Sequence, residues 1–211
     1  MSVDIFPNSQ LYETGYCVLF AKNISATEIL ARITDDQIAP IPLSRLEAEA
    51  VKARGQDVEE DDIPGLDLDE LRDSGVFDDS GPLLRSGTHG NWSFIIESEG
   101  SYLAGEEQLE AVSRGTVAFS AQVSETSSTW ISYAEDQEIL SSFDPLFPEQ
   151  DYGKRTEVLD ALTGYREVIE NGERSEAYEN ALRVIQRELR CVVPAEADAG
   201  RLLAIRIAGV Y

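Results

Sequence analysis

The sequence predicts an α+β fold, in which a mostly antiparallel sheet of about five strands has helices on one face and a helical C-terminal third. Apolar and aromatic runs with strand-like spacing fill residues 91–143. Apolar residues at helical spacing precede them and follow them. A chain of 211 residues, 42% of them hydrophobic, can bury one core, so we expect a single domain over residues 1–211. Its acidic, sheet-containing part is residues 1–150, and its helical part is residues 151–211.

The first elements are expected to be a strand and two helices. Residues 16–21 form an apolar run that predicts a buried strand. Ser25 and Glu28 have the spacing of a capping box, which predicts a helix start. Residues 44–54 are rich in helix-forming side chains with apolar residues along one side, and Gly55 ends this second helix.

The middle of the chain is expected to supply the other four strands. Aromatic and β-branched side chains favour this conformation, and the last two runs are separated by a loop of hairpin length. A helix over residues 105–113 interrupts the runs and has acidic side chains in its first turn, where the helix dipole favours them. The expected strands are residues 91–97, 116–123, 129–134 and 138–143.

The last third is predicted to be helical. Thr156 is placed to cap one helix, and Asn171 with Gly172 breaks it. Ser175 begins the next helix, in which apolar side chains recur along one face. Residues 199–207 fit a helix or a strand, and we favour a helix.

The chain is strongly acidic, with 40 Asp and Glu residues against 17 Lys and Arg and a formal net charge of −23. Residues 1–150 carry −21 of this charge, and residues 151–211 carry −2. The most acidic stretch, residues 57–79, has eleven carboxylates and a single basic residue, Arg72. We refer to it as the acidic segment. Leu66, Leu68 and Leu71 within it indicate that it packs against the core.

Charge of this sign and density repels nucleic acid and anionic membranes, and it attracts a basic protein. The acidic segment is therefore the predicted binding site for a basic partner protein, with carboxylates for steering and rim contacts and Leu66, Leu68 and Phe77 for the desolvated centre. A solvated acidic loop without a partner is the alternative. The predicted contact residues are Asp57, Glu59, Glu60, Asp61, Asp62, Leu66, Asp67, Leu68, Asp69, Glu70, Asp73, Phe77, Asp78 and Asp79.

No catalytic, cofactor or metal site is predicted. His89 is the single histidine, and no motif marks an activated nucleophile for it. An EF-hand loop beginning at Asp67 fails, since Leu71 and Arg72 stand at its fifth and sixth positions. Two other classes stay open. One is an enzyme that uses His89 or a carboxylate in a cleft between sheet and helices, and the other is an acidic subunit of a bacterial defence or secretion assembly.

Cys17 and Cys191 are far apart and each lies in an apolar run, which predicts buried, reduced thiols. The N-terminus has no basic stretch followed by an apolar one, and no run approaches the length of a membrane span. We therefore expect a cytoplasmic protein.

Several short blocks, taken in order, resemble an uncharacterised family of small bacterial proteins known as a domain of unknown function. The resemblance covers most of the chain and brings no active site with it. It implies a relationship to small acidic proteins that include immunity proteins of toxin systems. With the charge pattern, it leads us to expect a non-enzymatic binding protein, most concretely an immunity protein or antitoxin against a nuclease-like toxin. The blocks are Gly-Tyr-Cys-Val from Gly15, Ser-Ala-Thr-Glu from Ser25, Trp-Ser-Phe-Ile-Ile-Glu from Trp92, Ser-Tyr-Ala-Glu-Asp from Ser132 and Ser-Phe-Asp-Pro from Ser142.

Overall fold

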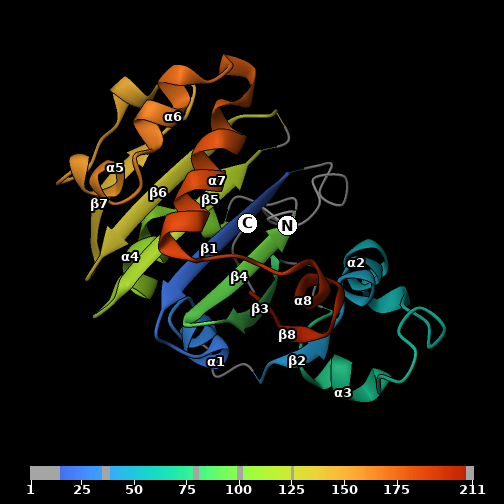
Figure 1. Cartoon of the computed structure of the whole chain (residues 1–211). Coiled ribbons are helices and arrows are strands. Elements are labelled where there is room, and N and C mark those ends of the chain that lie inside the picture. Colours follow the sequence, from blue (N-terminus) through green and yellow to red (C-terminus); the bar gives the residue numbers. More distant parts are fainter. Residues whose placement is uncertain (1–14, 35–38, 78–80, 99–101, 125, 208–211) are drawn as a thin grey trace.

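The strands of the described residues form one sheet of eight, in the order β2-β8-β3-β4-β1-β5-β6-β7 (Figure 1). The computed structural model describes residues 15–34, 39–77, 81–98, 102–124 and 126–207. Each neighbouring pair of strands is antiparallel. The strands are β1 (Tyr16–Lys22), β2 (Ile41–Leu43), β3 (Leu83–His89), β4 (Trp92–Ser98), β5 (Val117–Val123), β6 (Thr129–Glu135), β7 (Glu138–Phe143) and β8 (Leu202–Arg206).

The α+β class is confirmed, but the prediction of about five strands is wrong. The five expected strands correspond to β1, β4, β5, β6 and β7, and the structure adds β2, β3 and β8. β2 is three residues long and contains Pro42, while β3 places Arg85 and Ser86 where an apolar pattern would be expected. The helix favoured over residues 199–207 is also wrong, because most of that stretch is β8. Its Leu, Ala and Arg residues favour helices in isolation, whereas pairing with β2 and β3 decides the outcome.

Eight α-helices are present in the described residues, and their starts follow the sequence signals in part. The complete capping box lies at Ser44 and Glu47, where each side chain binds the main-chain N–H of the other residue. At the predicted box, Ser25 accepts a hydrogen bond from the Glu28 N–H, while the Glu28 carboxylate pairs with Arg32. The helices are α1 (Ala26–Ala31), α2 (Arg45–Arg54), α3 (Leu68–Asp73), α4 (Glu106–Ser113), α5 (Glu157–Thr163), α6 (Tyr165–Asn171), α7 (Ala177–Leu189) and α8 (Ala195–Ala199).

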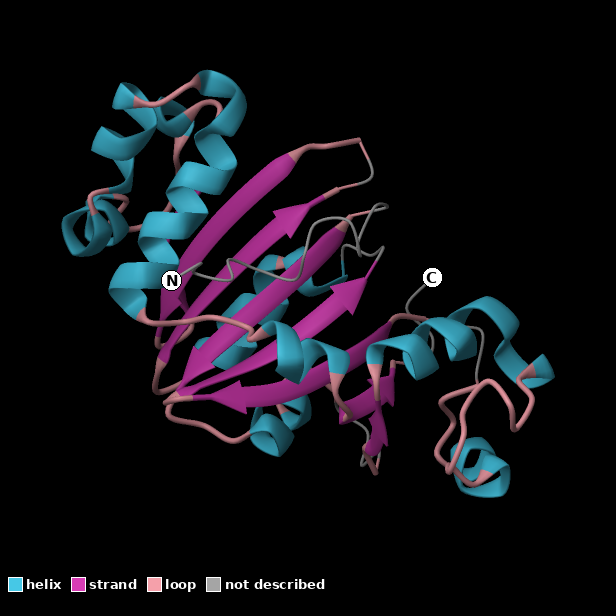
Figure 2. Ribbon diagram, turned by 45° about the vertical axis from the view of Figure 1, so that its right-hand side comes forward, coloured by secondary structure: helices cyan, strands magenta, loops and turns pink. Residues whose placement is uncertain are grey.

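Helices cover both faces of the sheet, so the expectation that they pack on one face is wrong (Figures 1 and 2). Strand β1 shows why: Val18 and Phe20 belong to the core cluster beneath α5, α6 and α7, whereas Leu19 belongs to the cluster beneath α1 and α4. All three side chains are fully buried. A strand covered on both faces reads as a continuous apolar run, and this is the pattern of residues 16–21.

A third, smaller core lies at the β2 end of the sheet, where α2, α3 and the acidic segment pack over β2 and β8 (Figure 2). Its side chains come from α2 (Val51), from the acidic segment (Ile63, Leu71) and from β2 (Leu43). Ile63 and Leu43 are fully buried, and Leu71 is 2% exposed. The acidic segment is therefore folded onto its own core, as the spacing of its leucines predicts.

Candidate functional site

The acidic segment alternates buried apolar residues with exposed acidic ones. After α2, a short 3-10 helix (Gly55–Asp57) leads into turns, and α3 follows. The Asp67 carboxylate begins α3 by accepting hydrogen bonds from the N–H groups of Asp69 (2.8 Å) and Glu70 (3.3 Å). These caps and the core beneath the segment hold its backbone in a defined shape while its carboxylates face outward.

Most of the predicted contact carboxylates are exposed. The exceptions are Asp62, which is partly buried, and Asp78 and Asp79, which lie outside the described residues. Two ion pairs involve the described part of the segment, Asp62 with Arg54 (2.7 Å) and Asp69 with Arg72 (2.9 Å). The exposed carboxylates are those of Asp57, Glu59, Glu60, Asp61, Asp67, Asp69, Glu70 and Asp73.

The three apolar residues predicted to contact the partner, Leu66, Leu68 and Phe77, differ in how deeply they are buried. Phe77 is 4% exposed and belongs to the small core of the protein itself. Leu66 and Leu68 are partly buried and pack on the edge of that core. Part of each leucine side chain therefore stays open to a partner, whereas Phe77 acts from beneath as support for the segment.

Leu66 and Leu68 also line a shallow, open hollow of about 600 Å³ on the surface of the acidic segment. Carboxylates surround the two leucines, and one guanidinium, that of Arg72, joins them. This arrangement suits a partner that presents a cationic side chain beside an apolar one. The complete lining is Glu60, Gly65, Leu66, Asp67, Leu68, Asp69 and Arg72.

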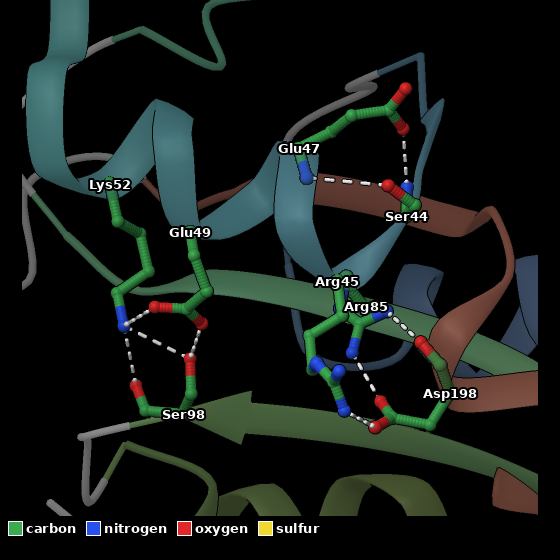
Figure 3. A network of polar contacts seen from close by, with 8 residues as sticks. All are labelled: Ser44, Arg45, Glu47, Glu49, Lys52, Arg85, Ser98 and Asp198. Atoms are coloured by element: carbon green, nitrogen blue, oxygen red, sulfur yellow. Dashed lines mark hydrogen bonds and ion pairs between the residues drawn. The ribbon is translucent and has the colours of Figure 1, made fainter. Parts of the chain in front are cut away.

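A network of polar contacts attaches α2, and with it the start of the acidic segment, to the rest of the fold (Figure 3). The Lys52 ammonium donates to the Ser98 hydroxyl at 2.9 Å and lies 3.6 Å from the Glu49 carboxylate. Arg45, at the other end of α2, donates to the Asp198 carboxylate at 3.3 Å. α2 is thereby fixed at one end to strand β4 and at the other to α8.

Asp198 also binds Arg85 of β3, and sequence reasoning missed this pair. The side chains are 5% exposed for Arg85 and 2% exposed for Asp198. Helix-forming residues surround Asp198, and Arg85 follows two leucines but precedes Ser86 and Gly87, so neither local pattern predicts a buried charge.

His89 is exposed at the end of β3, in the hairpin to β4, where it is paired across the sheet with Trp92. Glu97, a carboxylate that burial holds at a raised pKa, lies at the far end of β4, about 17 Å away along the strand. It accepts hydrogen bonds from the N–H groups of Tyr102 and Leu103. Glu97 thus has a structural role at the start of the 3-10 helix Tyr102–Ala104, and the structure does not bring it together with His89.

The two cysteines are free and buried, as expected. They belong to core clusters on opposite faces of the sheet, Cys17 beneath α1 and α4 and Cys191 beneath α7. Burial raises the pKa of the Cys191 thiol to about 12 and the pKa of the Cys17 thiol well above its ordinary value. Both thiols are therefore protonated and unreactive at neutral pH.

Within the described ranges, no three or more His, Cys, Asp or Glu side chains come together in a group that could hold a metal ion. The same part of the chain contains no helix with the length and apolar character needed to span a membrane.

Comparison with known proteins places the chain in a family. No curated protein and no protein of solved structure matches it. Residues 6–169 match a family model described as a family of unknown function, DUF6461. The match covers the acidic segment and β1 to β7, and it ends before α7, α8 and β8. The chain therefore belongs to the DUF6461 family of unknown function.

Proposed function

We propose that this protein is a non-enzymatic binding protein that holds a basic partner protein against the acidic segment. One observation carries the proposal: a folded segment exposes eight carboxylates, and three of them, those of Glu60, Asp67 and Asp69, line a hollow together with two partly buried leucines. If the segment were acidic but unfolded, it would be a solvated loop. If it were folded but had no exposed carboxylates, it would be part of the core. The combination is typical of a surface that attracts a cationic protein and then docks it.

Electrostatics supports a partner more than a solubility role. Two like charges 10 Å apart in water repel by about 0.4 kcal/mol, so the fold carries the segment at modest cost. The summed field accelerates encounter with a basic protein by about 10 to 1,000-fold at low salt. Solubility alone requires a net charge of about 2 to 8 in magnitude for a small domain, well below the −23 of this chain.

The rigid attachment of α2 supports the same function. Ordering a flexible binding loop costs about 0.5–1.5 kcal/mol for each immobilised side chain. Here, the contacts of Lys52 and Arg45 fix α2, and apolar residues such as Ile63 and Leu71 fix the segment that follows. Folding of the protein therefore already orders much of the binding surface, so less ordering free energy is lost when a partner binds.

The most concrete form of the proposal is an immunity protein or antitoxin in the bacterial cytoplasm that inhibits a nuclease-like toxin. A nuclease has a cationic groove for the phosphates of nucleic acid. The exposed carboxylates of a folded segment could bind in that groove in place of the phosphates. The expected result is a tight complex in which the groove is closed to nucleic acid.

The test compares two triple variants of equal charge change. In the first, Glu59, Glu60 and Asp61 of the acidic segment are replaced by Lys. In the matched control, the exposed Glu167, Glu170 and Glu173 are replaced by Lys. Each protein is used to capture binding proteins from the native host, and the association rate of the purified partner is measured over a range of salt concentrations.

A basic partner is expected, and the first variant should slow its association and flatten the salt dependence, while the control changes both far less. Equal effects of the two variants, or a captured partner without basic character, would contradict the proposal. For the antitoxin form, the partner should be toxic when expressed alone. Co-expression of the wild-type chain should relieve this toxicity, and co-expression of the first variant should not.

A second candidate is an acidic subunit of a larger assembly, and exposed apolar residues away from the acidic segment favour it. Leu146, Phe147 and Tyr152, which follow β7, are 38%, 39% and 45% exposed. Replacing Leu146 and Phe147 by Ser should release the protein from its captured complex if this surface is the interface. Retention of the complex by that variant and its loss from the acidic-segment variant would decide for the first candidate.

A further inference from the structure

Residues near the C-terminal end of the described chain contact the acidic segment at two points and also contact α2. Asp198 of α8 accepts a hydrogen bond from Arg45 at the start of α2. Arg201, just before β8, donates to the main-chain oxygen of Pro64 at 3.0 Å. Arg206, at the end of β8, donates to the main-chain oxygens of Val76 (3.0 Å) and Gly81 (3.1 Å). These residues lie beyond the stretch that matches the family model.

Arg201 is held in place by a second set of contacts. Its Nη2 lies 2.6 Å from Glu47 Oε1, and its Nε donates to both oxygens of that carboxylate, at 3.1 and 3.2 Å. Burial pushes the pKa of Glu47 upward, but the hydrogen bonds from Arg201 and Ser44 outweigh burial and leave the pKa below its ordinary value. The Glu47 carboxylate therefore stays ionised and holds the Arg201 guanidinium in a bidentate ion pair.

Arg201 binds the acidic segment without neutralising any of its carboxylates. Its partners are a carboxylate outside the segment, that of Glu47, and a main-chain carbonyl inside it, that of Pro64. An arginine close to so many acidic side chains would be expected to pair with one of them. Because Arg201 instead binds the backbone, the turn is fixed and the carboxylates around it stay available.

We propose that Arg201 is a positioning residue of the acidic surface: it holds the turn around Pro64 in its docking shape and thereby slows dissociation of a bound basic partner. The inference rests on the proposed function, and it concerns the same surface. The turn on each side of Pro64 contains main-chain hydrogen bonds from Asp62 to Glu59 and from Leu66 to Ile63. Loss of Arg201 should therefore make this turn open more often.

The test uses two variants that change the net charge in opposite directions. Arg201→Gln makes the chain more negative, and Glu47→Gln makes it less negative. Gln at position 47 still completes the capping box with Ser44, so α2 keeps its start. If charge alone mattered, the two variants would shift binding of a basic probe in opposite directions. If positioning matters, Arg201→Gln removes the hydrogen bond to Pro64, Glu47→Gln releases the guanidinium that donates it, and both variants shift dissociation in the same direction.

The first readout is hydrogen exchange in the free, full-length protein. Both variants should raise the exchange rates of the Asp62, Ile63 and Leu66 amides about tenfold or more, because a charge-assisted contact that closes the turn is lost. Exchange in β5 and β6 should stay as in the wild type. Arg187→Gln, which changes the charge as Arg201→Gln does but on the exposed face of α7, should leave the turn unchanged. Unchanged exchange at the turn in both variants overturns the inference.

The second readout is the dissociation rate of a synthetic helical peptide of lysine and leucine, chosen to match the carboxylates and leucines of the hollow. Both variants should release it several-fold faster than the wild type. Opposite shifts, following net charge, overturn the positioning role. If the wild-type protein does not bind the peptide or any captured basic protein, the proposed function fails, while the exchange measurement still decides whether Arg201 holds the turn.

Discussion

Arg85 and Asp198 form an ion pair in the interior of the protein, although 113 positions separate them in the sequence. The guanidinium of Arg85 donates through Nη1 to the main-chain oxygen of Asp198 at 2.8 Å and through Nη2 to its carboxylate. Arg45 donates to the second carboxylate oxygen. The pair links β3, near the centre of the sheet, with α8 and α2. A buried charge thus connects the sheet to the elements that carry the acidic segment.

Replacement of Asp198 by Asn should lower the free energy of unfolding by about 3–5 kcal/mol, because it removes the anionic partner from a buried guanidinium. Urea unfolding at neutral pH measures this loss. The exposed pair of Lys154 with Glu138 is the control, and Lys154→Gln should cost less than about 1 kcal/mol. A loss at Asp198 as small as at Lys154 would show that the buried pair contributes little support.

The elements that could be predicted from the sequence are those whose side chains form a local pattern. Residues 16–21 could be predicted as a strand from their continuous apolar run, and the strands between residues 91 and 143 from their aromatic and β-branched side chains. The anchoring of the acidic segment could be predicted because Leu66, Leu68 and Leu71 interrupt its carboxylates. In each case, the signal is local.

The missed elements depend on contacts between distant residues. Arg85 makes β3 look unlike a strand, and its partner is more than one hundred residues away. β8 contains helix formers and becomes a strand because β2 and β3 offer free edges. Arg201 gives no sign in the sequence that it binds the carbonyl of Pro64. The packing of the acidic segment on a core could therefore be predicted from the sequence, but the distant residues that hold the segment in shape could not.

Truncation of Leu71 should destabilise the acidic segment from beneath. Leu71 is 2% exposed and packs in the small core, so Leu71→Ala should cost about 2–4 kcal/mol. Leu46 offers a control of the same chemistry, since its side chain is 74% exposed and Leu46→Ala should change stability by less than about 0.5 kcal/mol. Chemical unfolding with hydrogen exchange of residues 58–77 measures both effects. Similar costs for the two variants would contradict the packing of the segment on its own core.

The stability of the protein should depend on pH in a way that separates Glu47 from Glu97. The folded-state pKa of Glu47 is lowered from its ordinary value of 4.5, so its contribution is fully present above pH 4.5 and is lost as the pH falls through the lowered pKa. The difference in unfolding free energy between the wild type and Glu47→Gln should therefore shrink below pH 4.5. A difference that stays constant down to acid pH would contradict the ion pair with Arg201.

Glu97 should give the opposite slope. Burial raises its pKa above 4.5, so the folded state binds this proton more tightly than the unfolded state does. Stability linked to Glu97 is then greatest at low pH and declines as the pH rises through the raised pKa. Relative to Glu97→Gln, the wild type should lose stability over that interval, as measured by urea unfolding at a series of pH values. A difference that grows with pH would show that the hydrogen bonds from Tyr102 and Leu103 outweigh burial.

Arg72 is the one basic residue of the acidic segment, and it occupies the hollow that we assign to the partner. Its guanidinium pairs with Asp69 at 2.9 Å, and the two side chains are 52% and 90% exposed, so the pair contributes little to stability. Arg72→Ser should free the Asp69 carboxylate and remove the one cationic side chain from the lining of the hollow. We expect association with a basic protein to become several-fold faster at low salt, and the gain to disappear at high salt.

The control for Arg72→Ser is Arg114→Ser, which changes the net charge equally at an exposed site after α4. Because the field of a single charge is screened within about 10 Å at 0.1 M salt, only the change inside the hollow should alter the encounter strongly. Stopped-flow association over a range of salt concentrations distinguishes the two variants. If Arg72→Ser instead slowed association, Arg72 would be a contact residue, and the partner would have to present an anionic group at this point of the surface.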